Sequence, residues 1–173
     1  MATWIGLLRG VNVGGRNKLP MADLRRIATD CGHTEVRTYI QSGNVVFDAK
    51  EKDARKLAAQ LRAAIAKETE IDCAVVLRSA DELAATIAKN PFPDDREHVH
   101  VVFMDTPPTA PPTFDASKYA PDELAISGRD VYLHLPNGVG RSKLAADVGR
   151  KKELTGTARN WRTIETLVEM ASA

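Results

Sequence analysis

The order of apolar runs and amphipathic segments along the chain constrains its fold more than any other feature. The first half alternates short apolar runs, typical of strands, with longer segments whose apolar residues recur at helical spacing. The predicted elements are strand, helix, strand, strand, helix and strand, near residues 3–9, 20–31, 36–40, 45–47, 52–68 and 71–77, and a short helix carrying Leu83 and Ile87 follows. Because Ser42-Gly43-Asn44 is a tight turn, the second and third strands form a hairpin, and the order is that of the split-βαβ or ferredoxin-like fold.

A second set of elements echoes the first. Residues 90–95 break the pattern with two prolines and are the expected junction. Beyond it we expect a strand at 99–104, a helical turn near 115–119, a hairpin of 124–126 and 131–135, and helices near 142–152 and 160–171. Residues 40–47 also resemble 126–133. We therefore expect an α+β fold of duplicated ferredoxin-like architecture, two antiparallel sheets with helices on one face, with a first unit at 1–89 and a second, βαββα unit at 90–173, packed as one compact protein.

The composition is that of an ordinary soluble protein. Hydrophobic residues make up 43% and charged residues 27% of the 173 residues, and no apolar run approaches the roughly 18–20 residues of a membrane helix. The N-terminus lacks the pattern of a signal peptide, so we expect a cytoplasmic protein. Cys31 and Cys73 fit that compartment as small buried hydrophobes, and a disulfide between them is the alternative.

A glycine-rich basic loop follows the first predicted strand. Arg9, Arg16 and Lys18 are cations with no acidic residue between them, and Gly14 and Gly15 allow backbone N–H groups to approach an anion. The spacing of Gly10 and Gly15 resembles a phosphate-binding P-loop, but the Lys-Ser/Thr pair of that motif is absent, which argues against a nucleoside triphosphatase. The alternative is a flexible strand-to-helix connection.

Three further features suit an anionic ligand. The hairpin turn carries Gln41 and Asn44, whose alternative role is turn formation, and residues 138–143 place glycines and cations before a helix that Ser142 can cap. Seven of the 24 basic but only two of the 23 acidic residues lie at 141–162, so this segment carries +5 while the chain carries +1. The candidate ligand-binding residues are Arg9, Asn12, Gly14, Gly15, Lys18, Gln41, Asn44, Arg141, Lys143 and Arg159.

Familiar catalytic and metal-binding sets are missing. His98 and His100 lie on one face of a predicted strand, but no further ligands follow at metal spacing, so we expect packed or half-exposed histidines and no metal. Asp94 and Asp95 are typical of a turn in a loop. Neither cysteine has a cationic setting that would make it a nucleophile, and no cofactor motif is present.

Several segments together resemble a known bacterial family. They are 8–15, 19–21, 39–47, 90–92, 140–143 and 158–161. On these segments the chain resembles domain-of-unknown-function family 1697 over nearly its full length. The resemblance implies a two-part ferredoxin-like α+β fold, and it implies no activity, substrate or catalytic residue.

These patterns predict a binder of a phosphate-bearing ligand, either a nucleic acid or a nucleotide-like metabolite. We expect the candidate residues of both halves to converge on one electropositive hollow. One alternative is an enzyme that acts on a small anionic substrate, with arginines and lysines stabilising developing charge. Another is a protein-interaction module that uses a sheet edge or the proline-rich segment 106–112. The oligomeric state stays open.

Overall fold

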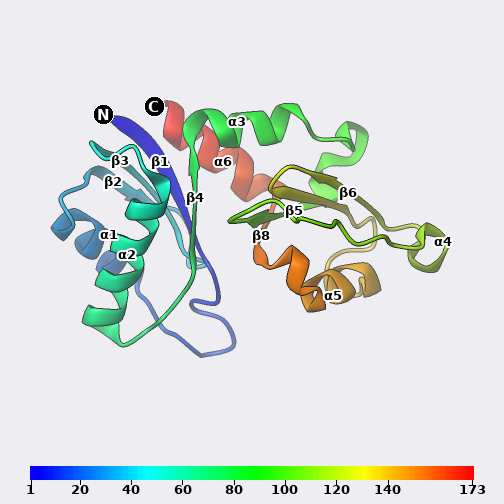
Figure 1. Cartoon of the computed structure of the whole chain (residues 1–173), viewed down its shortest axis with the longest axis horizontal. Coiled ribbons are helices and arrows are strands. Elements are labelled where there is room, and N and C mark those ends of the chain that lie inside the picture. The colour runs from blue at the N-terminus through cyan, green and yellow to red at the C-terminus, as the bar shows by residue number, and fades with distance from the viewer. The chain divides into compact units, whose positions relative to one another are not determined.

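Two antiparallel four-stranded sheets form the framework of the chain (Figure 1). The computed structural model describes all residues, Met1–Ala173, and the expectation of a mixed α+β fold with two antiparallel sheets is confirmed. Two compact units divide the chain: unit 1 comprises Met1–Ala85 and Thr166–Ala173, and unit 2 comprises Thr86–Glu165. No helix combines the length and the apolar character that a membrane span requires.

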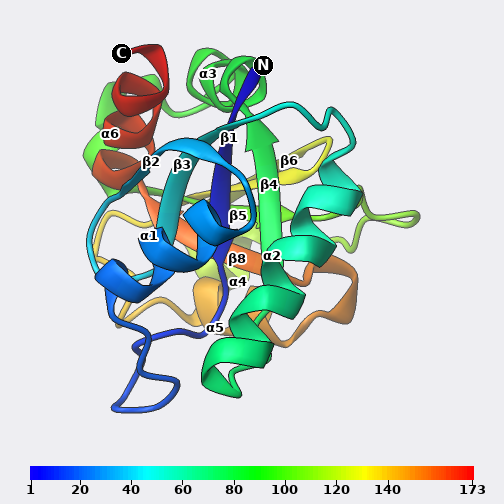
Figure 2. The ribbon, with the colours of Figure 1, turned by 90° about the vertical axis from the view of Figure 1, so that its left-hand side faces the viewer.

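Unit 1 follows the element order expected from the sequence. Its elements are β1 (Ala2–Leu8), α1 (Met21–Asp30), β2 (Thr34–Thr38), β3 (Asn44–Ala49), α2 (Ala54–Thr69) and β4 (Val75–Ser79), and the strand order in the sheet is β2-β3-β1-β4. Helices α1 and α2 lie side by side over one face of this sheet (Figure 2). Their buried residues, such as Leu24 and Leu61, share one hydrophobic cluster with Trp4, Leu8 and Phe47 of the strands.

Unit 2 has its own sheet with the order β6-β7-β5-β8. Its elements are the 3₁₀ helix η1 (Pro93–His98), β5 (Val99–Met104), α4 (Ala116–Tyr119), β6 (Glu123–Ser127), β7 (Asp130–His134), α5 (Lys143–Arg150), the 3₁₀ helix η2 (Lys152–Leu154) and β8 (Gly156–Asn160). Leu144 and Val148 of α5 pack with Met104, Val131 and Leu133 of the sheet. Both expected hairpins are therefore present, β2–β3 in unit 1 and β6–β7 in unit 2.

Two helices cross from one unit to the other. They are α3 (Ala80–Ala88) and α6 (Trp161–Ser172). The end of α6 joins unit 1, where Nη1 of Arg37 on β2 donates to the carbonyl of Met170 over 2.6 Å. The observed units thus differ from the expected ranges 1–89 and 90–173, because unit 1 gains the C-terminal helical turns and ends four residues earlier.

Strand β8 was not expected from the sequence. Its burial alternates, but the inward positions are the polar Thr157 and Arg159 while Ala158 is exposed, which inverts the usual apolar-inside pattern. Gly156 allows β8 to pair closely with β5, because a Cβ there would lie 2.3 Å from the carbonyl oxygen of Phe103.

The end of β2 also differs from the prediction, which placed Ile40 in this strand. Ile40 has a positive φ of 49° and is 48% exposed, so it lies beyond the end of β2.

Local capping explains where several helices begin. The Ser142 hydroxyl accepts from the backbone N–H of Ala145 over 2.9 Å, and Asn160 accepts from that of Thr163 over 2.9 Å, as expected for N-caps. Ser79 and Glu82 form a reciprocal capping box at the start of α3, with distances of 3.1 and 2.8 Å. Both cysteines are free, and Cys73 is buried in the core of unit 1.

Candidate anion-binding site

The segment at 9–18, here called the basic loop, is a short hairpin and not a P-loop. The backbone N–H of Arg16 donates to the carbonyl of Val13, and that of Asn12 donates to the carbonyl of Asn17, each over 3.0 Å. Gly14 and Gly15 form the tip with φ values of 58° and 73°, the positive pair that a type I′ turn requires. The basic loop extends beyond the end of β1 and away from the sheet (Figure 2). It therefore presents an exposed ribbon with glycines at its end.

The Asn12 side chain closes the base of the basic loop. Its Oδ1 accepts from the backbone N–H of Leu19 over 2.8 Å, and its Nδ2 donates to the carbonyls of Leu19 (2.9 Å) and Gln41 (2.7 Å). Val11 and Leu19 are fully buried on either side. Asn12 was expected to contact a ligand, but its amide is occupied by backbone partners, so it positions the basic loop instead.

The first hairpin turn packs against the base of the basic loop. The backbone N–H of Leu8 donates to the carbonyl of Gly43 over 2.9 Å. Gly43 has a φ of 91°, and a Cβ on it would lie 2.6 Å from Val11 Cγ2, so glycine is required for this contact. Asn44 is fully buried and donates to the Tyr39 carbonyl, which leaves it as a support of the turn and not as an exposed ligand contact. Gln41 is exposed beside the basic loop, as the site hypothesis requires.

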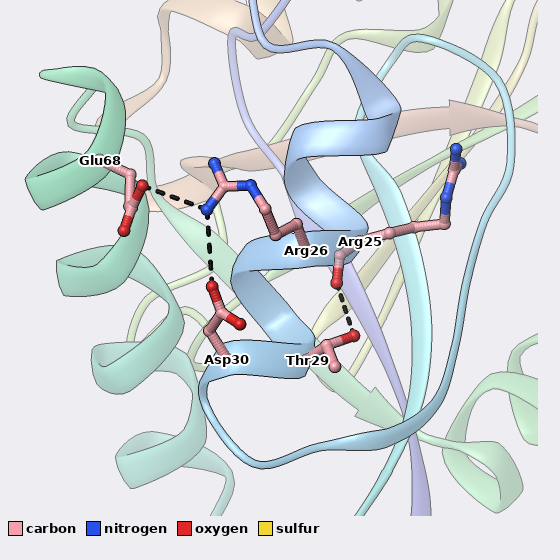
Figure 3. A network of polar contacts seen from close by, with 5 residues as sticks. All are labelled: Arg25, Arg26, Thr29, Asp30 and Glu68. Carbon is pink, nitrogen blue, oxygen red and sulfur yellow. Dashed lines mark hydrogen bonds and ion pairs between the residues drawn. The ribbon is translucent and has the colours of Figure 1, made fainter.

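The cations of the basic loop have no acidic partner. Arg9, Arg16 and Lys18 are exposed and form no ion pair. By contrast, Arg26 on α1 lies 3.5 Å from the carboxylate of Asp30 and 3.2 Å from that of Glu68 (Figure 3). Unpaired cations on a braced loop create a local positive potential that internal salt bridges do not neutralise.

The predicted site residues of unit 2 occupy two different settings. Arg141 and Lys143 are exposed at the start of α5, where Ser142 also donates to the carboxylate of Asp122 over 2.7 Å. Arg159 was expected to lie in a loop before the last helix, but it lies in β8 and is only 7% exposed. The expected convergence of the unit 1 and unit 2 residues stays a prediction.

Arg159 is held by its own strand. Its Nη1 donates to the Thr157 hydroxyl over 2.8 Å and to the Ala158 carbonyl over 2.9 Å. Burial removes water from the guanidinium and lowers its pKa to about 10, so the side chain is still charged at neutral pH. Its contacts indicate a structural role in unit 2.

Sequence reasoning missed a polar cluster on η1. The Asp95 carboxylate joins two imidazoles, at 2.7 Å from His98 Nδ1 and 2.8 Å from His134 Nε2, and Phe92 stacks on the His134 ring with a centroid distance of 5.2 Å. Hydrogen bonds from both imidazoles hold the pKa of Asp95 below its usual value, and Asp95 raises the pKa of His98. The three-residue spacing of Asp95 and His98 was a visible signal, but nothing local indicates His134. No group of three or more His, Cys, Asp or Glu side chains is placed to hold a metal ion.

Comparison with known proteins identifies relatives by family and by fold. Residues 1–132 match the family model described as "Protein of unknown function (DUF1697)", which confirms the resemblance seen in the sequence. No curated protein matches the chain. The solved structure of the conserved bacterial protein SP0830 from Streptococcus pneumoniae is similar, with a TM-score of 0.76 and 21% sequence identity over 98% of each chain. At this identity the likeness establishes the fold alone.

Proposed function

We propose that this chain, which belongs to the DUF1697 family of proteins of unknown function, binds a phosphate-bearing ligand through its basic loop. The observation that carries the proposal is that Arg9, Arg16 and Lys18 stand exposed and without acidic partners on a loop with a hydrogen-bonded base. A chain that keeps three adjacent cations unpaired bears their mutual repulsion, and a bound polyanion relieves it.

The shape of the basic loop favours an extended ligand. The loop that carries the cations is a hairpin that extends beyond the end of β1 (Figure 2), and such a projecting basic loop suits the successive phosphates of a nucleic acid better than one small metabolite. Under this proposal Arg9, Arg16 and Lys18 contact phosphates, and the N–H groups of Gly14 and Gly15 approach the backbone closely. The exposed Gln41 amide adds hydrogen bonding, while Asn12 and Asn44 hold the loop and the turn.

Residues of unit 2 extend the proposal. Arg141 and Lys143 are exposed cations of unit 2, and we propose that they give this unit positive charge of its own for an anionic ligand. The two free thiols fit a reducing compartment, and we infer that the protein works in the cytoplasm.

We also propose that the two units are duplicated ferredoxin-like halves. If the strands of each unit are numbered from one to four along the chain, both sheets have the order 2-3-1-4.

Salt-dependent binding tests the function. Fluorescence anisotropy with labelled duplex DNA, single-stranded RNA and AMP should detect binding to at least one nucleic acid at low salt. With three phosphate contacts, the affinity for duplex should fall about 40-fold between 50 and 200 mM salt, from a slope of roughly −0.9 per contact.

Matched charge variants locate the site. Combined Arg9→Ala, Arg16→Ala and Lys18→Ala should remove most of the binding and of its salt dependence. The control combines Lys50→Ala, Lys52→Ala and Lys56→Ala, which removes the same charge beside Glu51 and should bind like the wild type. Equal binding by the two triple variants would refute a site on the basic loop. Tighter binding of AMP than of either nucleic acid would make the ligand a metabolite.

A further inference from the structure

Unit 2 contains a cavity that the sequence did not suggest. It has a volume of about 450 Å³ and lies between α4 and the last turn of α5. The lining residues relevant to its chemistry are Phe114, Lys118, Tyr119, Asp147, Arg150 and Lys151. Its volume is within the range of pockets that hold a small organic ligand.

One wall of the cavity is aromatic. The rings of Phe114 and Tyr119 meet edge to face with a centroid distance of 6.0 Å. A second, smaller cavity of about 250 Å³ shares these two residues and is lined also by Leu124 and Leu144. The same aromatic pair thus lines both hollows and offers a planar ligand an apolar contact surface.

The hydroxyl of Tyr119 is held in place. It donates to the carboxylate of Asp147 over 2.6 Å, and Nη1 of Arg150 lies 2.8 Å from the other oxygen of that carboxylate. These contacts fix the orientation of the Tyr119 ring before any ligand binds, which lowers the entropic cost of stacking on it.

The acidic side chains of the cavity, Asp115 and Asp147, both accept hydrogen bonds from other groups of the protein. Asp147 is engaged as described, and Asp115 caps α4 by accepting from the backbone N–H of Ser117 over 3.1 Å and from its hydroxyl over 2.7 Å. Lys118 lies over the Tyr119 ring at 5.6 Å from the centroid, and neither it nor Lys151 forms an ion pair. The cavity therefore combines aromatic surface with two ammonium groups that form no ion pair, and of these Lys118 lies close enough to Asp115 and Asp147 to lower the pKa of both carboxyls.

We propose that this cavity binds a small ligand composed of a planar aromatic ring and a phosphate group. The ring packs against the apolar surface of Phe114 and Tyr119, and the phosphate lies between Lys118 and Lys151. This inference is independent of the function proposed for the basic loop, because it rests on other residues in the other unit.

Calorimetric titration of the whole chain tests this proposed site. The probe is phenyl phosphate, and phenol and inorganic phosphate, which each represent one half of the probe, are titrated separately. Phenyl phosphate should bind at least about tenfold more tightly than either half, since each half makes only one of the two contacts. Benzoate, an aromatic anion without phosphate, should bind more weakly than phenyl phosphate. Equal binding of the two compounds would indicate a general anion site and not a phosphate site. No phenyl phosphate binding at millimolar concentration would refute the proposal.

Variants assign the binding to this cavity. Combined Lys118→Ala and Lys151→Ala should weaken phenyl phosphate binding by about tenfold, and Phe114→Ala should reduce the advantage of phenyl phosphate over inorganic phosphate. Combined Lys52→Ala and Lys67→Ala is the control for the charge, and circular dichroism checks that all variants fold. Unchanged binding in the Lys118/Lys151 double variant would overturn the proposal. The triple variant of the basic loop should bind phenyl phosphate normally.

Discussion

The side-chain amide of Asn12 is the structural element of the basic loop whose removal is most informative. Asn12→Asp preserves the size of the side chain and its tolerance of the positive φ of 55°. The new carboxylate still accepts from the Leu19 N–H, but its second oxygen replaces the donor to the carbonyls of Leu19 and Gln41. Two hydrogen bonds are lost, and two carbonyl oxygens then face an anion.

The magnitude follows from these contacts. Each lost hydrogen bond is worth about 1 kcal/mol, and leaving a part-buried acceptor unsatisfied adds about 1 kcal/mol more. Attraction to the neighbouring exposed cations returns less than about 1 kcal/mol. We therefore expect Asn12→Asp to lower the free energy of unfolding of unit 1 by about 2–3 kcal/mol at neutral pH.

A second asparagine in the same loop provides the control. Asn17 also has a positive φ, of 51°, but its amide makes a single donation, to the Gly10 carbonyl over 3.0 Å. Asn17→Asp introduces the same charge and should cost only about 1 kcal/mol.

Urea unfolding followed by tryptophan fluorescence measures both changes. A Trp161→Phe background leaves Trp4, which is 7% exposed in the core of unit 1, as the reporter. If Asn12→Asp costs no more than Asn17→Asp, the amide of Asn12 does not brace the basic loop, and the argument for a preorganised site fails.

Three further predictions concern other parts of the structure. Gly43→Ala should destabilise unit 1 by about 2–4 kcal/mol in urea unfolding, because it combines a φ of 91° with a Cβ 2.6 Å from a valine methyl group; a loss below about 1 kcal/mol would contradict the close packing. The contact of Asp95 with His98 raises the histidine pKa and lowers the carboxyl pKa. Its stabilising effect should therefore be largest between about pH 4 and 6.5, fall as the pH rises through the raised histidine pKa, and fall as the pH drops through the lowered carboxyl pKa. The stability difference between wild type and His98→Gln, measured from pH 3 to 9, checks this, and a flat difference would refute it. Burial raises the pKa of the Cys73 thiol, so in a Cys31→Ser background a thiol-specific reagent should modify it slowly when the protein is folded and rapidly in urea; rapid modification of the folded protein would contradict its burial.

Patterns along the chain were sufficient for most of the secondary structure. Hydrophobic periodicity and turn chemistry predicted the six elements of unit 1 and both hairpins, with shifts of a few residues at their ends. Ser142 was correctly expected to cap a helix, because an N-cap is decided by residues within one turn of each other. Strand β8 was not predicted, because its inward positions carry the polar residues Thr157 and Arg159 and the sequence therefore lacks the apolar alternation of a strand.

The sequence indicated the basic loop but not what each of its residues contacts. The sequence indicated a basic loop next to a hairpin turn, and the structure joins them through Asn12 and Gly43. Residue type alone does not reveal that Asn12 and Asn44 use their amides on backbone partners, because those partners come from other segments of the chain. The same holds for the aromatic cavity, which α4 and α5 form together.

What the sequence determined by itself was therefore local: which segments become strands or helices, where helices begin, and where cations stand without acidic neighbours. Such features depend on contacts within a few residues, and composition and spacing encode them directly. Only the tertiary structure decided the pairing of β8 with β5, the burial of Arg159 and the meeting of Asp95 with His134. Those depend on chain segments brought together by burial of the hydrophobic core, which no local spacing records.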